Sequence, residues 1–370
     1  MITSIIVFVA VLSVLILVHE LGHFFVAKRS GVWVEEFGFG LPPRVIGKKV
    51  GETIYSINLL PFGGFVRLHG ENSDEALSDP KRAFLNQNKK KKVAIIVAGV
   101  IMNFFLAITA FSISYSFSGI PRQTENVKVV EVAEGSPAAD AGLKEGDVVK
   151  EIEGKEVKTT EDFINIIEEV KGETVNVVLL REGQELTLPT NLREDPPQGE
   201  GAMGVVISSV ETYFPPLWQR PFYGVYYGVR DAFYWGEVII VSFVGMIANL
   251  FRGVVPKDVA GPVGIYALTS QAAQFGILAL INFVGILSIN LAVLNILPFP
   301  ALDGGRLFFI IIEAIFGKKV LPKVEAITHT VGMAILLLLI LAITFQDVRR
   351  LIMAGSVSGF IDSLMQSQQP

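Results

Sequence analysis

Residues 2–29 read ITSIIVFVAVLSVLILVHELGHFFVAKR, and this stretch decides what kind of protein the chain is. Its first part, 2–18, is interrupted only by Thr3 and Ser13 and is otherwise apolar, so the run is long enough to span a bilayer as a helix. It lacks the cationic start and the small-residue cleavage site of a secretory signal. We therefore expect a retained transmembrane helix that carries HELGH, residues 19–23, near its end.

The composition agrees with a membrane protein. Of the 370 residues, 51% are hydrophobic and only 18% are charged, which is too apolar for an ordinary soluble protein. The net charge of −5 gives no basic field, so we expect no nucleic-acid partner. The chain has no cysteine and four histidines, so nitrogen and oxygen atoms must hold any metal, and the candidate ligands are few.

Three further spans are predicted at residues 93–117, 275–297 and 331–345. Another apolar stretch, 232–251, carries Glu237 and lies among aromatic residues. That combination is typical of a helix at the membrane interface. We expect this stretch to lie on the membrane or dip into it rather than cross it.

Basic residues orient these spans. The segment between the first two spans, 28–92, holds twelve Lys and Arg, and the positive-inside bias places it in the cytoplasm. The N-terminus and region 120–220 then lie outside. If 232–251 does not cross, the chain returns to the cytoplasm near Asp303, in agreement with the basic residues of the following loop: Arg306, Lys318, Lys319 and Lys323. Four spans satisfy the bias, whereas five would place Arg306 and both lysines of the 318–319 pair outside.

Two segments outside the spans show the alternation of β-strands. Residues 33–70 are rich in glycine and predict a small curved sheet at the membrane. Residues 125–192 predict a compact α+β domain that ends in a hairpin turning at Glu182-Gly183. Its expected strands are 127–132, 148–152 and 175–181, and its expected helix is 160–170, begun by Thr159 or Thr160.

The chain therefore divides into four parts. Residues 1–119 hold the first two spans and the cytoplasmic β-rich segment, and residues 120–200 form the outside domain. Residues 201–274 contain a linker and the interfacial helix. Residues 275–370 hold the last two spans.

The HELGH motif brings together residue types that bind and use a metal. His19 and His23 are four residues apart, so on a helix both imidazoles face one side and can reach one ion. Glu20 lies beside them, where a carboxylate can take a proton from water, as in metallopeptidases. The alternative is that these side chains only contact neighbouring helices. Charged groups in a span cost roughly 2.5–3.5 kcal/mol each on insertion scales and are functional by default.

A hydrolytic zinc site needs a third protein ligand and one open position. His69, in the β-rich segment, and His329, at the start of the last span, are candidates. Asp303 is the stronger one, because it ends the stretch 295–303 in which two prolines break the helix. Backbone exposed in this way at membrane depth is tolerated only where it lines a protein cavity. The competing interpretation makes Asp303 only the N-cap of a helix over 307–316.

The sequence resembles the site-2 protease family of intramembrane zinc metallopeptidases, and within it the bacterial members that regulate envelope-stress sigma factors. The likeness rests on HELGH at 19–23, NILPFPALDGG at 295–305 and LPFGGFV at 60–66, together with Gly99 and Asn103 in the second span. In addition, the stretch GSPAADAGLKEGD at residues 135–147 resembles the turn of a PDZ domain.

This resemblance implies a multi-pass α-helical membrane protein with about four transmembrane helices, a small membrane-associated β-sheet and one α+β PDZ-like domain. It implies Zn²⁺ held by His19, His23 and Asp303, with Glu20 activating water. Asn295 would line the cleft, where its amide could hold the substrate or stabilise the oxyanion.

The resemblance also implies a location and a substrate. The protein would lie in the cell (inner) membrane, with the PDZ-like domain extracytoplasmic and the active site toward the cytoplasm. Its substrates would be single membrane helices, trimmed beforehand by another protease, for example in anti-sigma factors or signal-peptide remnants.

A helical substrate must unwind before its peptide bond can be cleaved. We expect an edge of the glycine-rich sheet, at 53–59 or 38–40, to pair with the unwound segment, the alternative being a purely structural hairpin. A peptide C-terminus would dock between strand 127–132 and helix 160–170, unless the PDZ-like domain acts instead as a size filter against bulky ectodomains.

Two rival functions come from other classes. An inert membrane scaffold that displays a peptide-binding domain would require every chemical residue of HELGH and LDGG to be vestigial. A secondary transporter also uses broken helices and buried charge, but it would be expected to show an inverted repeat, and none is visible in the sequence.

Overall fold

The computed structural model describes residues 2–71, 78–197, 199–252, 259–317 and 320–366. Two basic residues used to orient the spans, Lys318 and Lys319, lie outside these described residues. The chain divides into two compact units, one formed by residues 1–118 together with 217–370 and the other by residues 119–216.

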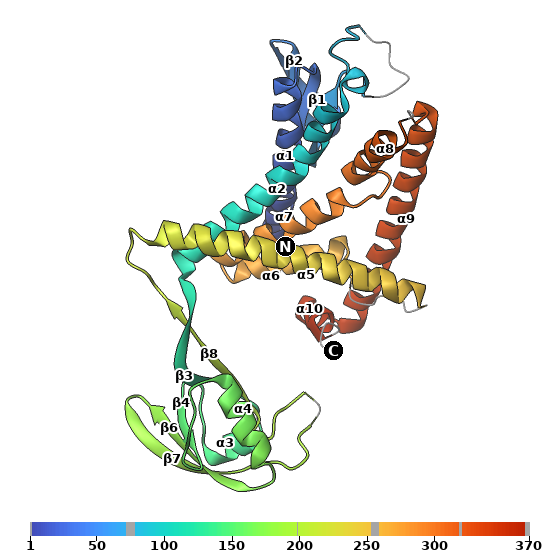
Figure 1. Ribbon diagram of the computed structural model, residues 1–370. Helices are drawn as coiled ribbons and strands as arrows, with labels where there is room; N and C mark the ends of the chain where they lie inside the picture. Colours follow the sequence, from blue (N-terminus) through green and yellow to red (C-terminus); the bar gives the residue numbers. More distant parts are fainter. Residues whose placement is uncertain (1, 72–77, 198, 253–258, 318–319, 367–370) are drawn as a thin grey trace. The chain divides into compact units, whose positions relative to one another are not determined.

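The first unit is mainly helical and contains all the predicted spans (Figure 1). Five of its helices are long and apolar enough to cross a membrane, within the described part of the chain: α1 (Ile2–Arg29), α2 (Lys89–Ser118), α5 (Arg220–Phe251), α7 (Ile277–Ile296) and α9 (Pro322–Ala354). Shorter helices complete it: α6 (Pro262–Gln274), α8 (Asp303–Phe316), α10 (Val357–Gln366) and the 3-10 turn η1 (Phe84–Asn86). The protein is therefore a membrane protein with several long apolar helices, as the sequence indicates.

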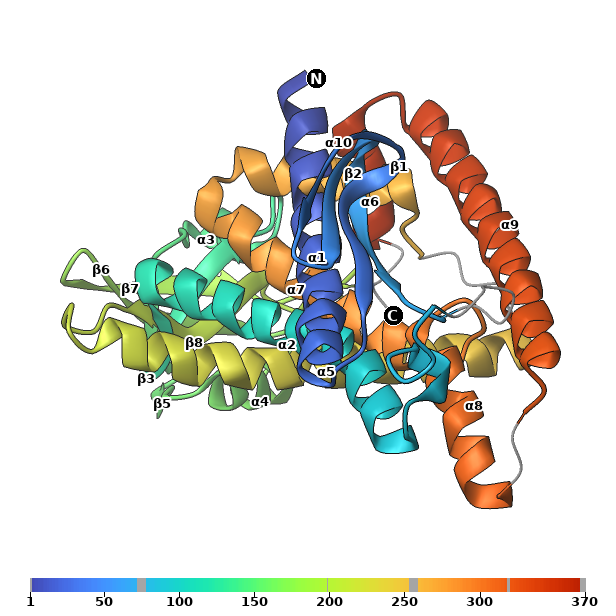
Figure 2. The ribbon, with the colours of Figure 1, turned by 90° about the horizontal axis from the view of Figure 1, so that it is seen from above.

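The stretch 232–251 is the second half of α5, which begins already at Arg220. Figures 1 and 2 both show α5 running across the direction of α1. Its aromatic side chains are largely exposed, with 73% of Phe222 and 64% of Tyr226 accessible. Length and composition alone make α5 a candidate span.

The β-rich segment forms a hairpin of two long strands, β1 (Val34–Val50) and β2 (Thr53–Leu68), that turns at Gly51 with φ of +64°. Both strands curl back on themselves, so the sheet has four segments. Their order is 44–50, 53–58, 34–41 and 64–68. The outer edges of the sheet are thus formed by the first and last of these segments.

This order corrects the expected edge of the sheet. The prediction that 53–59 or 38–40 pairs with a substrate is wrong, because these segments lie inside the sheet. Tyr55 is paired with both Lys48 and Phe37, and Gly38 is paired with both Phe65 and Ser56. The backbone groups that a substrate would need are already used, and the sequence alternation could not show how the strands fold back.

A shared hydrophobic core fixes the sheet against the helices. Phe24 of α1 packs with Val34 and Leu68 of the sheet, with Phe84 of η1 and with Ile95 of α2, all of them buried. Burial of large apolar side chains is the main stabilising contribution to such a junction. It holds the edge segment 64–68 beside α1, the helix that carries HELGH.

The second unit is an α+β domain with its own core. Its elements are β3 (Ile120–Val132), α3 (Pro137–Ala141), β4 (Val148–Ile152), β5 (Lys155–Glu156), α4 (Thr160–Glu169), β6 (Thr174–Arg181), β7 (Gln184–Asn191) and β8 (Val205–Tyr213). The strand order is β7-β6-β4-β3-β8, with β5 paired to β4. Thr159 caps α4 in a capping box with Asp162, and the β6–β7 hairpin turns at Glu182-Gly183, as predicted.

The end of this unit differs from the expected boundary at residue 200. β8 pairs with β3 as the outer strand of the sheet, so the unit continues to Pro216. The predicted docking strand 127–132 lies within β3, which has β4 on one side and β8 on the other. That expectation is therefore wrong, because β3 has no open edge. Of the described strands, β8 is the edge strand that contacts α4.

Candidate active site

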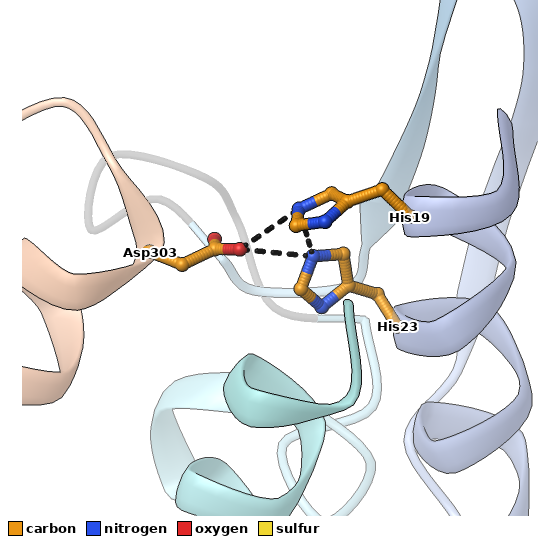
Figure 3. Close-up of side chains that lie close together, drawn as sticks. All are labelled: His19, His23 and Asp303. Carbon is orange, nitrogen blue, oxygen red and sulfur yellow. Dashed lines mark hydrogen bonds and ion pairs between the residues drawn. The ribbon is translucent and has the colours of Figure 1, made fainter. Parts of the chain in front are cut away.

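Three side chains from distant parts of the chain meet in the helical unit (Figure 3). His19 and His23 lie on one face of α1, with their Nε2 atoms 3.1 Å apart. Asp303, from the start of α8, places Oδ2 3.0 Å from His19 Nε2 and 3.2 Å from His23 Nε2. The structure thus brings together the two histidines of HELGH and the aspartate of LDGG.

Helix α2 orients both imidazoles through their other nitrogen. His23 Nδ1 donates to the Ile95 carbonyl oxygen at 2.8 Å, so its proton lies on Nδ1 and Nε2 keeps a free lone pair. His19 Nδ1 lies 3.3 Å from the amide nitrogen of Asn103, which is fully buried. An oxygen acceptor at Nδ1, such as the Ile95 carbonyl for His23, is typical of histidines that bind a metal through Nε2.

Two glycines allow α1 and α2 to approach closely enough for these contacts. A Cβ on Gly22 would come within 2.4 Å of the Ala98 carbonyl oxygen. A Cβ on Gly99 would lie 2.5 Å from His23 Nε2 and 2.6 Å from His19 Cε1. Small residues at such crossings are typical of membrane helix pairs. Here the second glycine also leaves room for both imidazole rings.

Replacing Gly99 with alanine should therefore damage the cluster directly. The added methyl group must displace both rings, and a misplacement of about 1 Å costs roughly a hundredfold in activity. We expect a loss of that size in cleavage of a membrane-helix reporter by the purified variant, with faster release of bound zinc to a chelator. Gly245→Ala is the matched control, because no atom of the described residues, apart from the neighbouring backbone of its own helix, lies within 4 Å of a Cβ on that glycine. Equal activity of the two variants would contradict the described packing.

Asp303 reaches the histidines through the irregular connection between α7 and α8. Leu297 ends α7 in an extended conformation just before Pro298. Gly304 and Gly305 pack against backbone, where a Cβ would come within 2.0 Å of the Leu297 carbonyl oxygen and 2.5 Å of that of Phe299. Glycine is required at both positions, so the GG of LDGG lets the chain fold tightly behind the carboxylate.

Helix α8 begins at Asp303, and its N-cap residue is Leu302, which makes no side-chain cap. The competing interpretation, with Asp303 as the N-cap of a helix over 307–316, is therefore wrong. The helix starts a turn earlier than expected, and Oδ2 of Asp303 faces the histidines instead of the helix amides.

Glu20 lies on the wall of a cavity of about 670 Å³ that also borders His19, His23 and Asp303. Its Oε2 accepts the Val66 backbone N–H at 3.1 Å. Val66 belongs to the outer segment 64–68 of the sheet, so the carboxylate stands between the histidine cluster and a sheet edge.

The other predicted site residues have different surroundings. Asn295 is nearly buried, with Nδ2 3.4 Å from His19 Nε2, but it is not among the described residues that line the cavity. His69 contacts Glu35 at 2.7 Å through Nδ1 and accepts the Asp79 N–H at Nε2, so both of its ring nitrogens are already used. His329 lines the cavity and accepts the Ala301 N–H at Nδ1.

One ion pair beside the cavity is not predictable from the sequence. Arg306 of α8 forms an ion pair with Glu71, and the other oxygen of Glu71 accepts the Leu68 N–H at 3.3 Å. The pair ties the end of the sheet edge to the helix of Asp303. Nothing local in the sequence relates Arg306 to Glu71, so in the sequence this residue indicates orientation alone.

The arrangement fits a metal by its donor atoms. Of the described His, Asp and Glu residues, His19, His23 and Asp303 form the group whose donor atoms converge. Donors at about 2.0–2.1 Å from a tetrahedral Zn²⁺ lie roughly 3.3 Å from one another, close to the 3.0, 3.1 and 3.2 Å found here. Two imidazole nitrogens that face each other need a proton or a metal between them. A set of two nitrogens and one carboxylate is typical of a hydrolytic metal site.

Comparison with known proteins gives a consistent result. The family model "Peptidase family M50" matches residues 7–339. A protein of Clostridium perfringens strain 13 that is named as a zinc metalloprotease is 37% identical, over 91% of this chain and 96% of its own length. The regulator of sigma-W protease RasP of Bacillus subtilis strain 168 is 27% identical, over 95% of this chain and 99% of its own. The PDZ domain of the SdrC-like protein of Listeria monocytogenes is 28% identical, covers 22% of this chain and 87% of its own, and has a TM-score of 0.21.

Proposed function

Since the chain belongs to peptidase family M50, the site-2 proteases that cleave proteins within the membrane, we propose that His19, His23 and Asp303 hold its zinc ion and that Glu20 is its general base. The observation that carries the proposal is the convergence of three donor atoms 3.0–3.2 Å apart. The residue that follows the first histidine, Glu20, stands on the wall of the same cavity.

Each residue then has a chemical task. When bound, zinc supplies a Lewis acid that makes water more acidic and polarises a carbonyl group. Glu20 takes the proton from the attacking water and passes it to the nitrogen of the leaving amine. The amide of Asn295, beside His19, donates toward the oxygen on which negative charge develops. With its amide turned over, so that the oxygen left without a partner among the described residues faces the ring, Asn103 would accept the proton of His19 Nδ1 when Nε2 is a ligand.

Removing the metal tests this proposal. Prolonged treatment of the purified protein with a chelator should reduce cleavage of a membrane-helix reporter at least about a hundredfold, because both the Lewis acid and the acidified water are lost. Restoring one equivalent of Zn²⁺ should return the activity, whereas Mg²⁺ should not, since it prefers six oxygen ligands. Full activity after verified metal removal would refute the proposed chemistry.

The substrate is an unwound membrane helix that adds as a strand to the sheet edge 64–68. This edge borders the cavity at Phe65 and Val66, and a substrate strand would take over the Val66 N–H that Glu20 Oε2 accepts in the free protein. Main-chain hydrogen bonds from such an edge replace those lost on unwinding, which lipid cannot supply. The segment also presents the scissile bond next to the proposed base.

Cross-linking can locate the substrate, because the chain contains no cysteine. Val66→Cys in an inactive Glu20→Gln protein should form a disulfide with single cysteines near the scissile bond of a substrate helix. Ile46→Cys is the matched control, since it lies in the opposite outer segment 44–50 and is 64% exposed. We expect at least about tenfold more cross-linking at position 66, given the effective concentration of docked groups. Preferential cross-linking at position 46 would place the substrate at the other edge.

The topology proposed for the chain has four crossings, by α1, α2, α7 and α9, with α5 at the membrane interface. Three observations support this topology: α5 runs across the direction of α1, its aromatic side chains are exposed, and the positive-inside bias fits four crossings. Of the basic residues behind that bias, Lys318 and Lys319 lie outside the described residues. The protein would lie in the cell membrane, with residues 119–216 extracytoplasmic and the metal site toward the cytoplasm.

The physiological substrate is proposed to be a membrane-anchored regulator, such as an anti-sigma factor trimmed beforehand by another protease, or a signal-peptide remnant. The name of the B. subtilis relative, a regulator of sigma-W protease, supports the first of these. Residues 119–216 would bind a new peptide C-terminus beside β8 and α4, or exclude bulky ectodomains. The inert scaffold is disfavoured because His19, Glu20, His23 and Asp303 all border one cavity.

A further inference from the structure

The turn that carries Asp303 is held by α9, a helix that supplies no atom to the donor cluster. His329 Nδ1 accepts the Ala301 backbone N–H at 3.0 Å. Gly332, three residues along the same helix face, lies against Pro300, where a Cβ would come within 2.3 Å of the proline Cβ and 2.7 Å of its carbonyl oxygen. One face of α9 therefore contacts two consecutive residues of the turn.

The backbone of this turn is strained at Ala301. Its φ is +81°, and Ala301 is the one described non-glycine residue of the helical unit in the left-handed region. A residue with a side chain persists there only where its surroundings enforce it. The turn closes by the Leu302 N–H donating to Phe299 at 3.2 Å, but that contact leaves the Ala301 N–H to an outside acceptor. His329 is that acceptor.

The geometry points to His329 as the positioning residue for Asp303: by accepting the Ala301 N–H, it holds the strained turn in the conformation that presents Oδ2 to His19 and His23. Ala301 stands two residues before Asp303, so a change in its backbone moves the carboxylate. A neutral imidazole that accepts at Nδ1 carries its proton on Nε2. That Nε2 is buried and has no hydrogen-bond partner among the described residues. The hydrogen bond from Ala301 is therefore the polar interaction that the structure shows for this imidazole.

This inference rests on the proposed function and deepens it. His329 was a candidate third ligand by composition alone, and the structure gives it a different task. A positioning residue of this kind typically changes metal affinity by about tenfold or more when it is lost.

Acceptor variants of the full-length protein test the inference. His329→Leu removes the acceptor, and His329→Gln moves it away from the Nδ1 position. His329→Asn keeps an oxygen near that position. Ala301→Gly, combined with His329→Leu, relieves the backbone strain without restoring the bond. Thr344→Val, farther along α9, is the control, because among the described residues its hydroxyl bonds only the Ile340 carbonyl of its own helix.

Three readouts apply to each variant: hydrogen exchange of residues 297–305 in zinc-free protein, the rate of zinc release to a chelator, and kcat and KM on a membrane-helix reporter. For His329→Leu and His329→Gln we expect about tenfold faster exchange and zinc release and about tenfold lower kcat, with KM unchanged. His329→Asn should stay within about threefold of wild type, and Ala301→Gly should recover most of the loss in the His329→Leu background.

Several outcomes would overturn the inference. If both the leucine and the glutamine variant keep the wild-type hydrogen exchange, zinc release and kcat, the hydrogen bond from Ala301 to His329 does not hold the turn. Equal damage from asparagine and leucine, or no recovery with Ala301→Gly, would show that the acceptor and the strain are irrelevant. If the wild-type protein itself binds no zinc, the proposed function fails. If it binds zinc and the variants match it, only the role of His329 fails.

Discussion

Replacing Glu20 with glutamine is expected to abolish cleavage of a membrane-helix reporter while leaving zinc bound. Glutamine keeps the shape of the side chain and can still accept the Val66 N–H through its amide oxygen, but it cannot take a proton from water. General-base catalysis contributes roughly 10²–10⁴-fold, so activity should fall by at least about a hundredfold. The measurement is reporter cleavage in liposomes together with the zinc content of the same preparation.

The pairing of the two measurements makes this result informative. Glu237→Gln, on the exposed side of α5, is the matched control and should retain both activity and zinc. Undiminished cleavage by Glu20→Gln would refute the proposed base. Loss of zinc from Glu20→Gln would instead show that the carboxylate belongs to the ligand set.

Replacing Asp303 with alanine is expected to remove both zinc and activity. Its Oδ2 is the carboxylate oxygen in the cluster, 3.0 and 3.2 Å from the two Nε2 atoms. His69 is not expected to replace it, since its ring nitrogens already contact Glu35 and the Asp79 N–H. Zinc affinity should fall by at least about a hundredfold, because losing even a residue that only hydrogen-bonds to a metal ligand lowers metal affinity by about 10–100-fold.

Asp140→Ala, on the exposed surface of α3, is the matched control for this variant. Both proteins should be monodisperse and equally helical, so that a difference in zinc content reports the site alone. Retention of one equivalent of zinc by Asp303→Ala would mean that another residue is the third ligand, and His69→Ala and His329→Leu in that background would identify it.

The sequence predicted the parts of the site that depend on local spacing. Two histidines four residues apart must share a helix face, and α1 places them so. The break at Pro298 and Pro300 and the double glycine after Asp303 indicated a tight turn at the helix end, and that turn is present. A chain without sulfur had to use nitrogen and oxygen ligands.

What the sequence could not predict depends on contacts between distant segments. Alternation identified the strands of 33–70, but not that they curl so that 64–68 becomes an outer edge. In the second unit, the glycine-rich stretch before β8 predicts a linker, whereas the pairing of β8 with β3 is distant in sequence and cannot be read from it. His329 looked like a ligand by residue type, and only tertiary structure shows its bond to Ala301.

X-ray anomalous scattering at the zinc edge, from crystals of the full-length Glu20→Gln protein, tests the central claim most directly. We expect one zinc peak per chain, at about 2.0–2.2 Å from Nε2 of His19, Nε2 of His23 and a carboxylate oxygen of Asp303. The fourth coordination position of the zinc ion should be open toward the cavity that Glu20 borders. A zinc peak ligated by His69 or His329, or zinc-loaded protein with no peak between α1 and α8, would contradict the proposed site.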